Sequence, residues 1–288
     1  MRKKHQEDEE PTKVTFGGIM ATIFFTLVSI VFVSPIIIVL INSLKDKTYI
    51  NLETFKLPTA DSFVGFENYK EAITQYDFIK AVGWTVLITV ASVFVILLCC
   101  SMAAWYITRV QNVFTKIIYL LCVFSMVIPF QMVMFTLAGT ADALHLNTPW
   151  GIIIVYLGFG AGLAVFMFCG FMKSIPLEVE EAAMIDGCTP IQTFFKIVVP
   201  MLKPTYISVA ILEAMWIWND FLLPYLVLDI KKYKTISIVI QYMKGSYGRV
   251  DMGAIMACLV MAIIPVVVFY LCAQKYIIKG VAAGAVKG

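Results

Sequence analysis

The stretch that decides the fold is residues 143–172, ALHLNTPWGIIIVYLGFGAGLAVFMFCGFM, which contains no Asp, Glu, Lys or Arg. A helix needs about 20 consecutive apolar residues to cross the hydrocarbon core of a bilayer, so this run is long enough to span one. Comparable runs recur along the chain, and one of them is interrupted only by Glu213 and Asp220. We therefore predict an all-α, polytopic membrane protein with about six transmembrane helices, at residues 16–42, 81–107, 117–139, 150–172, 204–228 and 252–274.

The composition excludes an ordinary soluble domain. Of the 288 residues, 60% are hydrophobic and 14% are charged, whereas a soluble domain has about 25% charged residues. The seven cysteines fall mostly in the apolar runs, where Cys behaves as a small hydrophobe, and there are only two histidines. We therefore expect no disulfide framework and no metal site. The net charge of +3 is spread along the chain and does not indicate nucleic-acid binding.

The chain divides into a short tail, residues 1–13, and a single transmembrane domain, residues 14–288. The tail mixes basic and acidic side chains and is predicted to be solvated. The first apolar run is about twice the length of a signal-peptide core, which has about 7–15 apolar residues, and it lacks a convincing small-residue cleavage site. We expect it to be a retained first span.

The distribution of basic residues bears on orientation. An even number of spans places both termini on one side, and that side carries 12 Lys and Arg residues against 10 on the other. The short loops differ more clearly, because Arg109 and Lys116 flank one turn while residues 139–149 contain neither Lys nor Arg. Positive charge favours the cytoplasm, so this pattern favours cytoplasmic termini by a small margin.

Residues 174–202 form the segment most unlike the rest of the chain. Pro176 suits a first helical turn, and the acids that follow it suit the positive end of a helix dipole. Gly187 suits a helix end because glycine accepts a left-handed conformation. Thr189 and Gln192 then form a capping box. We predict a helix–glycine–helix hairpin at the membrane surface, and its second helix carries one apolar stripe, made of Ile191, Phe194, Phe195 and Val198. From the residues alone, a hairpin resting on lipid is an equal alternative to a hairpin that binds a partner.

The same segment resembles the signature loop of binding-protein-dependent ABC importer permeases, which reads E-A-A, three residues, G, nine residues, I-x-L-P. Here the loop reads Glu181-Ala182-Ala183, Gly187 and Ile197-Val198-Val199-Pro200, with Val199 in place of Leu. Residues 216–224 (WIWNDFLLP) and 274–288 (QKYIIKGVAAGAVKG) are similar to the carbohydrate-uptake branch that includes the second maltose permease subunit, and NSLK at 42–45, GFENY at 65–69 and NTPWG at 147–151 agree with it.

The resemblance implies a non-catalytic permease in a bacterial cell membrane, with both termini in the cytoplasm. It implies that the hairpin couples the spans to separate ATPases and that the spans import a sugar or oligosaccharide by alternating access. The implied coupling residues are Glu181, Ala182, Ala183, Asp186, Gly187, Ile197 and Pro200. The implied partners are two ABC ATPase subunits, a homologous sister permease and an extracytoplasmic sugar-binding protein, with ATP and Mg bound on the ATPases and no cofactor on this chain. The sequence lacks the phosphate-binding motif G-x-x-x-x-G-K-[ST], in agreement with ATP binding elsewhere.

Polar residues inside the fifth predicted span are candidates for the translocation pathway. Glu213, Trp216 and Asp220 have i, i+3, i+7 spacing, with Asn219 beside them, so they are predicted to share one helical face. Ionisable residues within a span usually face a bundle interior or a wet cavity. Carboxylate, amide and indole groups suit a sugar, but the same residues could instead hold helices together by hydrogen bonds.

The loop at residues 229–251 resembles the one that reaches a docked binding protein, with Tyr247 and Arg249 as candidate contacts. A lysine-rich solvated loop is the alternative. A secondary transporter or channel would also have six spans and intramembrane acids. An intramembrane enzyme is a further class, although neither H-E-x-x-H nor G-x-S-x-G occurs. Multi-sugar, raffinose-type, maltodextrin, other oligosaccharide and glycerol phosphate substrates all remain open.

Overall fold

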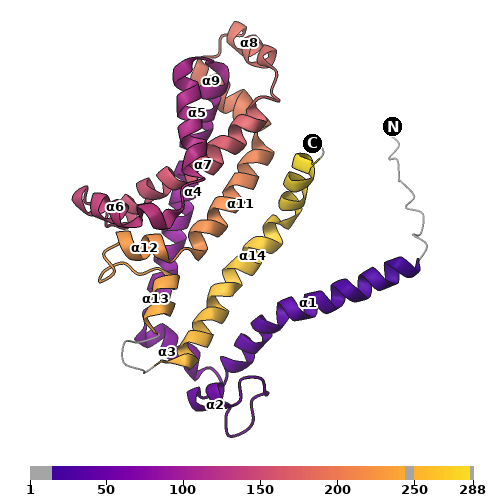
Figure 1. Cartoon of the computed structure of the whole chain (residues 1–288), viewed down its shortest axis with the longest axis vertical. Coiled ribbons are helices and arrows are strands. Elements are labelled where there is room, and N and C mark those ends of the chain that lie inside the picture. Colours follow the sequence, from indigo (N-terminus) through magenta and orange to yellow (C-terminus); the bar gives the residue numbers. More distant parts are fainter. Residues whose placement is uncertain (1–14, 244–249, 286–288) are drawn as a thin grey trace.

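The computed structural model describes residues 15–243 and 250–285, and within them the chain is built from helices with no sheet strand (Figure 1). An isolated antiparallel bridge joins Lys45 and Phe63. The all-α prediction is confirmed. The helices are α1 (Phe16–Asn42), α2 (Lys47–Leu52), α3 (Glu67–Gln75), α4 (Phe78–Arg109), α5 (Val113–Ser125), α6 (Phe130–Ala143), α7 (Pro149–Met172), α8 (Leu177–Ile185), α9 (Pro190–Thr193), the π-helix η1 (Phe194–Val198), α10 (Val199–Met201), α11 (Lys203–Asn219), α12 (Leu222–Val227), α13 (Ile236–Tyr242) and α14 (Met252–Ala285).

Four helices in the described part of the chain are long and apolar enough to cross a bilayer: α1, α4, α7 and residues Met252–Gln274 of α14. Two further candidates are bent pairs of helices. The helices α5 and α6 meet at 107°, and the segment Pro190–Met201 meets α11 at 78°. The chain therefore has up to six spans, if each bent pair counts as one.

The third predicted span, residues 117–139, is divided between two helices. α5 ends at Ser125, and α6 begins after Pro129, which caps it in an extended conformation. Proline has no amide hydrogen to continue the helical ladder, and it forces the residue before it out of the helical region.

The fifth span also ends earlier than residues 204–228 would require. α11 stops at Asn219, and Asp220 has ψ 131°. The Asp220 carboxylate then accepts hydrogen bonds from the backbone amides of Leu222 (3.0 Å) and Leu223 (3.4 Å), which start α12. The break therefore occurs at Asp220, whose side chain holds the first amides of α12, and Pro224 lies within α12.

The core of the bundle lies between α4, α7 and α11, with α5 packed on α7. Ile96 of α4, Tyr156 and Phe168 of α7 and Val209 of α11 are fully buried in one cluster. Gly162 lets α7 approach α5 closely, since a Cβ there would lie 2.8 Å from the Cys122 carbonyl oxygen. These packed helices contain the larger of the two buried clusters in the described part of the chain.

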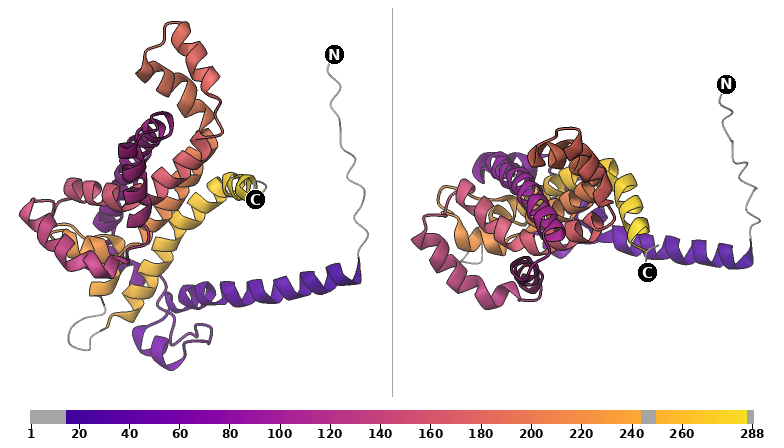
Figure 2. Two further views of the ribbon diagram at one scale, coloured as in Figure 1. Left: turned by 45° about the horizontal axis from the view of Figure 1, so that its top comes forward. Right: turned by 90° about the horizontal axis from the view of Figure 1, so that it is seen from above.

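The two ends of the bundle carry different elements. The C-terminal ends of α4 and α7, the start of α5 and the helix α8 lie at the upper end in Figure 1, and α2, α3 and α13 lie at the lower end. We call these the hairpin end and the opposite end. α1 diverges from the bundle in Figures 1 and 2, and its apolar side chains are mostly exposed. It offers apolar surface to lipid or to another subunit.

Candidate functional site

The turn of the hairpin has the predicted backbone. α8 ends at Ile185, and Gly187 has φ +89°, in the left-handed region that favours glycine. The amide of Cys188 donates to the Ala183 carbonyl (3.0 Å), which closes the end of the helix. Pro176 precedes α8 as its N-cap and is not in its first turn.

The second arm of the hairpin begins as predicted. The Gln192 side chain accepts from the Thr189 amide (2.9 Å), and the Thr189 hydroxyl accepts from the Gln192 amide (3.3 Å). Pro190 occupies the first helical position. The capping box and the proline therefore set where this arm starts.

The predicted apolar stripe on the second arm is wrong. Phe194 and Val198 are buried, whereas Ile191 and Phe195 are exposed. The buried side is the one that meets α4, where the Phe194 ring packs against the Trp105 ring with centroids 5.4 Å apart. The arm therefore packs through Phe194 and Val198 and leaves apolar side chains on its outer surface.

An ion pair missed by the sequence analysis attaches the hairpin to the bundle. Arg109, the last residue of α4, donates to Glu180 Oε1 from Nη2 (2.6 Å) and from Nε (2.9 Å). Trp105 Nε1 donates to the other carboxylate oxygen (2.8 Å), and Arg109 Nη2 also donates to the Ile175 carbonyl (3.0 Å). Glu180 is only 2% exposed. The sequence gives little indication of this pair, because Glu180 is one of three acids in α8 and all three suit the helix dipole.

The outer surface of the hairpin combines apolar and acidic side chains. We call this surface the hairpin tip, and it consists of exposed residues on α8, the turn and the start of α9: Glu181, Ala182, Met184, Ile185, Asp186 and Ile191. Ile185 is 85% exposed. Ala183 is buried, Ile197 is half-buried and Pro200 is exposed. An exposed apolar patch of this kind marks a site of interaction with a partner protein or with a membrane.

Glu213 and Trp216 lie on the side of α11 that faces α7, and Asp220 reaches the same helix from beyond the end of α11. Glu213 is 2% exposed, and its Oε2 has no hydrogen-bond partner among the described residues. It lies against α7 where Gly160 leaves room, since a Cβ on Gly160 would be 2.9 Å from this oxygen. Asp220 lies beyond the end of α11, so the i, i+7 relation to Glu213 does not apply.

Trp216 and Asp220 converge on Tyr156 of α7, one helical turn before Gly160. The Trp216 ring packs edge-on against the Tyr156 ring, with centroids 5.5 Å apart, and the Tyr156 hydroxyl donates to Asp220 Oδ2 (3.1 Å). Asn219 donates to the Met215 carbonyl (2.7 Å) and lines a largely apolar cavity of about 230 Å³ between α4, α11 and α14. The four residues therefore occupy three separate environments.

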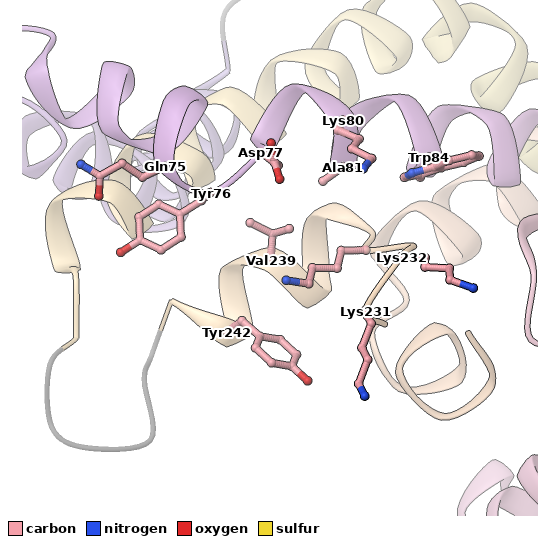
Figure 3. Close-up of a pocket in the computed structure, with 11 residues that line it drawn as sticks. Gln75, Tyr76, Asp77, Lys80, Ala81, Trp84, Lys231, Lys232, Val239 and Tyr242 are labelled. Atoms are coloured by element: carbon pink, nitrogen blue, oxygen red, sulfur yellow. The ribbon is translucent and has the colours of Figure 1, made fainter. Parts of the chain in front are cut away.

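A basic pocket of about 140 Å³ lies at the opposite end, between the start of α4 and the segment before α13 (Figure 3). Lysines dominate its lining: Lys80, Lys231, Lys232 and Lys234. Lys232 pairs with Asp229 (3.6 Å), whereas Lys80 and Lys231 make no ion pair with any residue that the structure describes. This pocket can attract negatively charged groups.

Aromatic side chains frame the same pocket. Lys234 lies over the Tyr242 ring at 5.2 Å, and the Tyr76 hydroxyl donates to Asp251 Oδ2 (3.1 Å). Burial, together with the bonded Asp251 carboxylate, raises the pKa of Tyr76, so its phenol stays protonated. The predicted contacts Tyr247 and Arg249 lie outside the described residues. Within the described part of the chain, no three His, Cys, Asp or Glu side chains cluster as metal ligands do.

Residues 96–283 match the family described as "binding-protein-dependent transport system inner membrane component". The chain is 38% identical to the "probable starch degradation products transport system permease protein AmyC" of Thermoanaerobacterium thermosulfurigenes. The alignment covers 288 residues and the full length of both chains. It is 33% identical over 270 residues to the "multiple sugar-binding transport system permease protein MsmG" of Streptococcus mutans, covering 92% of this chain and 95% of that one.

The fold is also similar to a chain in the crystal structure of a bacterial ABC transporter involved in the import of the acidic polysaccharide alginate. The TM-score is 0.75 at 21% identity, and the match covers 90% of this chain and 96% of that one. At this identity the likeness concerns the fold alone.

Proposed function

The chain belongs to the family of binding-protein-dependent transport system inner membrane components, and from this premise we propose that it imports a sugar or oligosaccharide as the permease subunit of an ATP-driven transporter. The observation that carries this proposal is the 38% identity, over the full length of both chains, to a permease named for starch degradation products. The similarity to a multiple-sugar permease agrees with it. The identity of the sugar stays open among oligosaccharides of these kinds.

We further propose that the hairpin tip couples this chain to an ATPase. Ala182 permits close approach of a partner backbone, while Ile185 offers an apolar side chain and Glu181 and Asp186 offer partners for Lys or Arg. Gly187 sets the angle between the arms. Ala183 packs inward, and Ile197 and Pro200 position the second arm where it joins α11.

The attachment of the hairpin suggests how movement reaches the membrane. The Arg109–Glu180 pair joins α8 to the end of α4, and the second arm continues through α10 into α11. A displacement of the tip would therefore move α4 and α11 together, and these helices pack on α7 in the core. We propose that this movement switches the spans between inward-facing and outward-facing states.

The remaining partners follow from the same proposal. Two ABC ATPase subunits would bind ATP and Mg, because this sequence has no phosphate-binding loop, and a sister permease would complete the pathway. The hairpin and both termini would lie in the cytoplasm. The basic pocket at the opposite end would then face outward, where it fits an acidic patch on a docked sugar-binding protein.

The candidate pathway residues differ in their proposed roles. Trp216 and Asp220, with Tyr156, offer aromatic faces and a carboxylate, which suit the C–H faces and hydroxyl groups of a sugar. Asn219 offers an amide at the mouth of the apolar cavity. Glu213 is enclosed between α4, α7 and α11, so we propose that it has a packing role.

Reconstitution in liposomes tests this function. The chain with its ATPases, sister permease and binding protein is expected to take up labelled maltodextrins or raffinose-type sugars only when ATP is present inside. The chain alone is expected to neither hydrolyse ATP nor transport. Uptake by the chain alone, driven by an ion gradient, would contradict the proposal and favour a secondary transporter.

A further inference from the structure

A cavity of about 500 Å³ opens at the hairpin end, between α4, α5 and α7. It is separate from the hairpin tip and from the candidate pathway. Its polar lining includes Lys116 from the first turns of α5, Lys173 at the end of α7, and Gln111 from the turn between α4 and α5. Ile107 and Leu120 add apolar walls. The cavity therefore combines positive charge with apolar surface where the helices end.

The two lysines are available to a ligand. Both side chains are exposed, and neither makes an ion pair with any described residue. Arg109 is close in sequence, but its guanidinium is occupied by Glu180. Among the described residues that line the cavity, none is acidic. The site therefore favours an anion.

The hydrogen-bonding groups of the lining are mostly donors. The hydroxyls of Thr108 and Thr115 already donate to the carbonyls of Ala104 (2.7 Å) and Val110 (2.6 Å). The groups left to donate are the two ammonium groups, the Gln111 amide and the Tyr119 hydroxyl. Several donors around one cavity suit the oxygens of a phosphate group.

An apolar face continues from the cavity along α5. Ile117, Leu120, Leu121 and Phe124 have i, i+3, i+4, i+7 spacing and are all exposed. Leu120 belongs both to this face and to the cavity lining. A ligand that fills the cavity can therefore extend an apolar chain down α5 toward the middle of the membrane.

We propose that this cavity, the α4–α5–α7 cavity, binds an anionic phospholipid of the leaflet at the hairpin end, with its phosphate between Lys116 and Lys173 and an acyl chain along α5. Basic pockets between transmembrane helices are known to hold anionic headgroups. The bound lipid would lie beside the end of α4, next to the ion pair that attaches the hairpin. The assignment of this leaflet to the cytoplasmic side rests on the proposed function. The proposal that the cavity binds a lipid does not depend on that function.

Native mass spectrometry tests the proposal on the full chain, extracted with whichever subunits it carries. Wild type is expected to retain phosphatidylglycerol in preference to phosphatidylcholine, and K116A/K173A is expected to lose that preference. K56A/K70A is a matched control, since it removes the same charge at the opposite end, where each lysine already pairs with a glutamate. The control is expected to behave as wild type. Equal retention of phosphatidylglycerol by K116A/K173A would overturn the proposal.

Thermal unfolding in nanodiscs distinguishes lipid binding from a structural role of the two lysines and from binding of free phosphate. Phosphatidylglycerol is expected to raise the unfolding midpoint of wild type above its value in phosphatidylcholine, and K116A/K173A should lose this rise. An equal fall of the midpoint of K116A/K173A in both lipids would show that the lysines serve the fold, which overturns the proposal. If inorganic phosphate raised the unfolding midpoint of wild type in phosphatidylcholine by the same amount, the ligand would be free phosphate, which would overturn the proposal that it is a lipid. Uptake measurements are independent of both results, so failure of the proposed function can be recognised separately.

Discussion

Arg109 and Glu180, 71 positions apart in the sequence, join the end of α4 to α8 through two hydrogen bonds from the guanidinium to Glu180 Oε1, of 2.6 and 2.9 Å. Trp105, four residues before Arg109, holds the other carboxylate oxygen. The carboxylate is buried and satisfied on both oxygens, so the hairpin is attached to the bundle at a defined point. Glu180 therefore holds α8 against the C-terminal end of α4.

Glu180→Ala is expected to loosen the hairpin and reduce uptake more than ATPase activity. Removing one partner of a buried ion pair costs about 3–5 kcal/mol, and we expect the lower part of that range because Arg109 is 18% exposed. Hydrogen exchange of the α8 amides and the uptake-to-hydrolysis ratio measure the effect. Glu178→Ala removes an exposed acid from the same helix and is the control. Equal uptake by both variants would contradict the role of this pair.

Gly187→Val is expected to abolish uptake while the protein remains at normal abundance in the membrane. A β-branched residue is strained at φ +89°, at a cost of about 1–3 kcal/mol, which is large for a surface hairpin. No neighbouring atom among the described residues lies within 4 Å of a Cβ built there, so the effect comes from the backbone. Gly187→Asn is the matched variant, since Asn accepts this conformation, and it should retain more uptake. Loss of both variants from the membrane would indicate that the hairpin only supports the fold.

Orientation can be measured at Ile185, whose side chain is well exposed. In a cysteine-free background, Ile185→Cys should react with an impermeant thiol reagent only after the cytoplasmic side is opened. Phe55→Cys, at an exposed position of the opposite end, should react in intact cells. The reverse pattern would overturn the proposed topology.

Asp220→Ala is expected to reduce uptake more than Asp220→Asn. Alanine removes the acceptor of the Leu222 and Leu223 amides and of the Tyr156 hydroxyl, and each such hydrogen bond is worth about 0.5–1.5 kcal/mol. Asparagine keeps an oxygen acceptor for the amides while removing the charge. Uptake kinetics at equal protein abundance measure the difference. If Asp220→Asn alone abolished uptake, the negative charge itself would be required in the pathway.

Glu213→Leu is expected to leave uptake unchanged and to raise the thermal unfolding midpoint. A buried polar atom without a partner costs about 1–3 kcal/mol, and Glu213 Oε2 has none among the described residues. Glu213→Gln keeps the size and hydrogen-bonding capacity and serves as the comparison. If both variants lost uptake at normal abundance, Glu213 would have a role in the translocation pathway and the packing role would be contradicted.

Local sequence signals determined the membrane class, the principal helices and the hairpin turn. Runs without charge predicted α1, α4, α7 and α14, because crossing a bilayer requires length and apolar composition that can be read from one segment alone. The turn was predictable for a related reason. Gly187, Thr189, Pro190 and Gln192 act on backbone groups within a few residues of themselves, so their order in the chain is sufficient.

Tertiary structure alone decided which side chains are buried and which are paired. Glu178, Glu180 and Glu181 look equivalent in the sequence, and only the packing of α8 over the end of α4 brings Glu180 to Arg109. Phe194 is likewise buried against Trp105 of α4, whereas its neighbour Phe195 is exposed. Asp220 lies beyond the end of α11 and is held on α7 by the hydrogen bond that it accepts from Tyr156. Each of these outcomes depends on where a distant helix lies, and periodicity within one segment carries no information about that position.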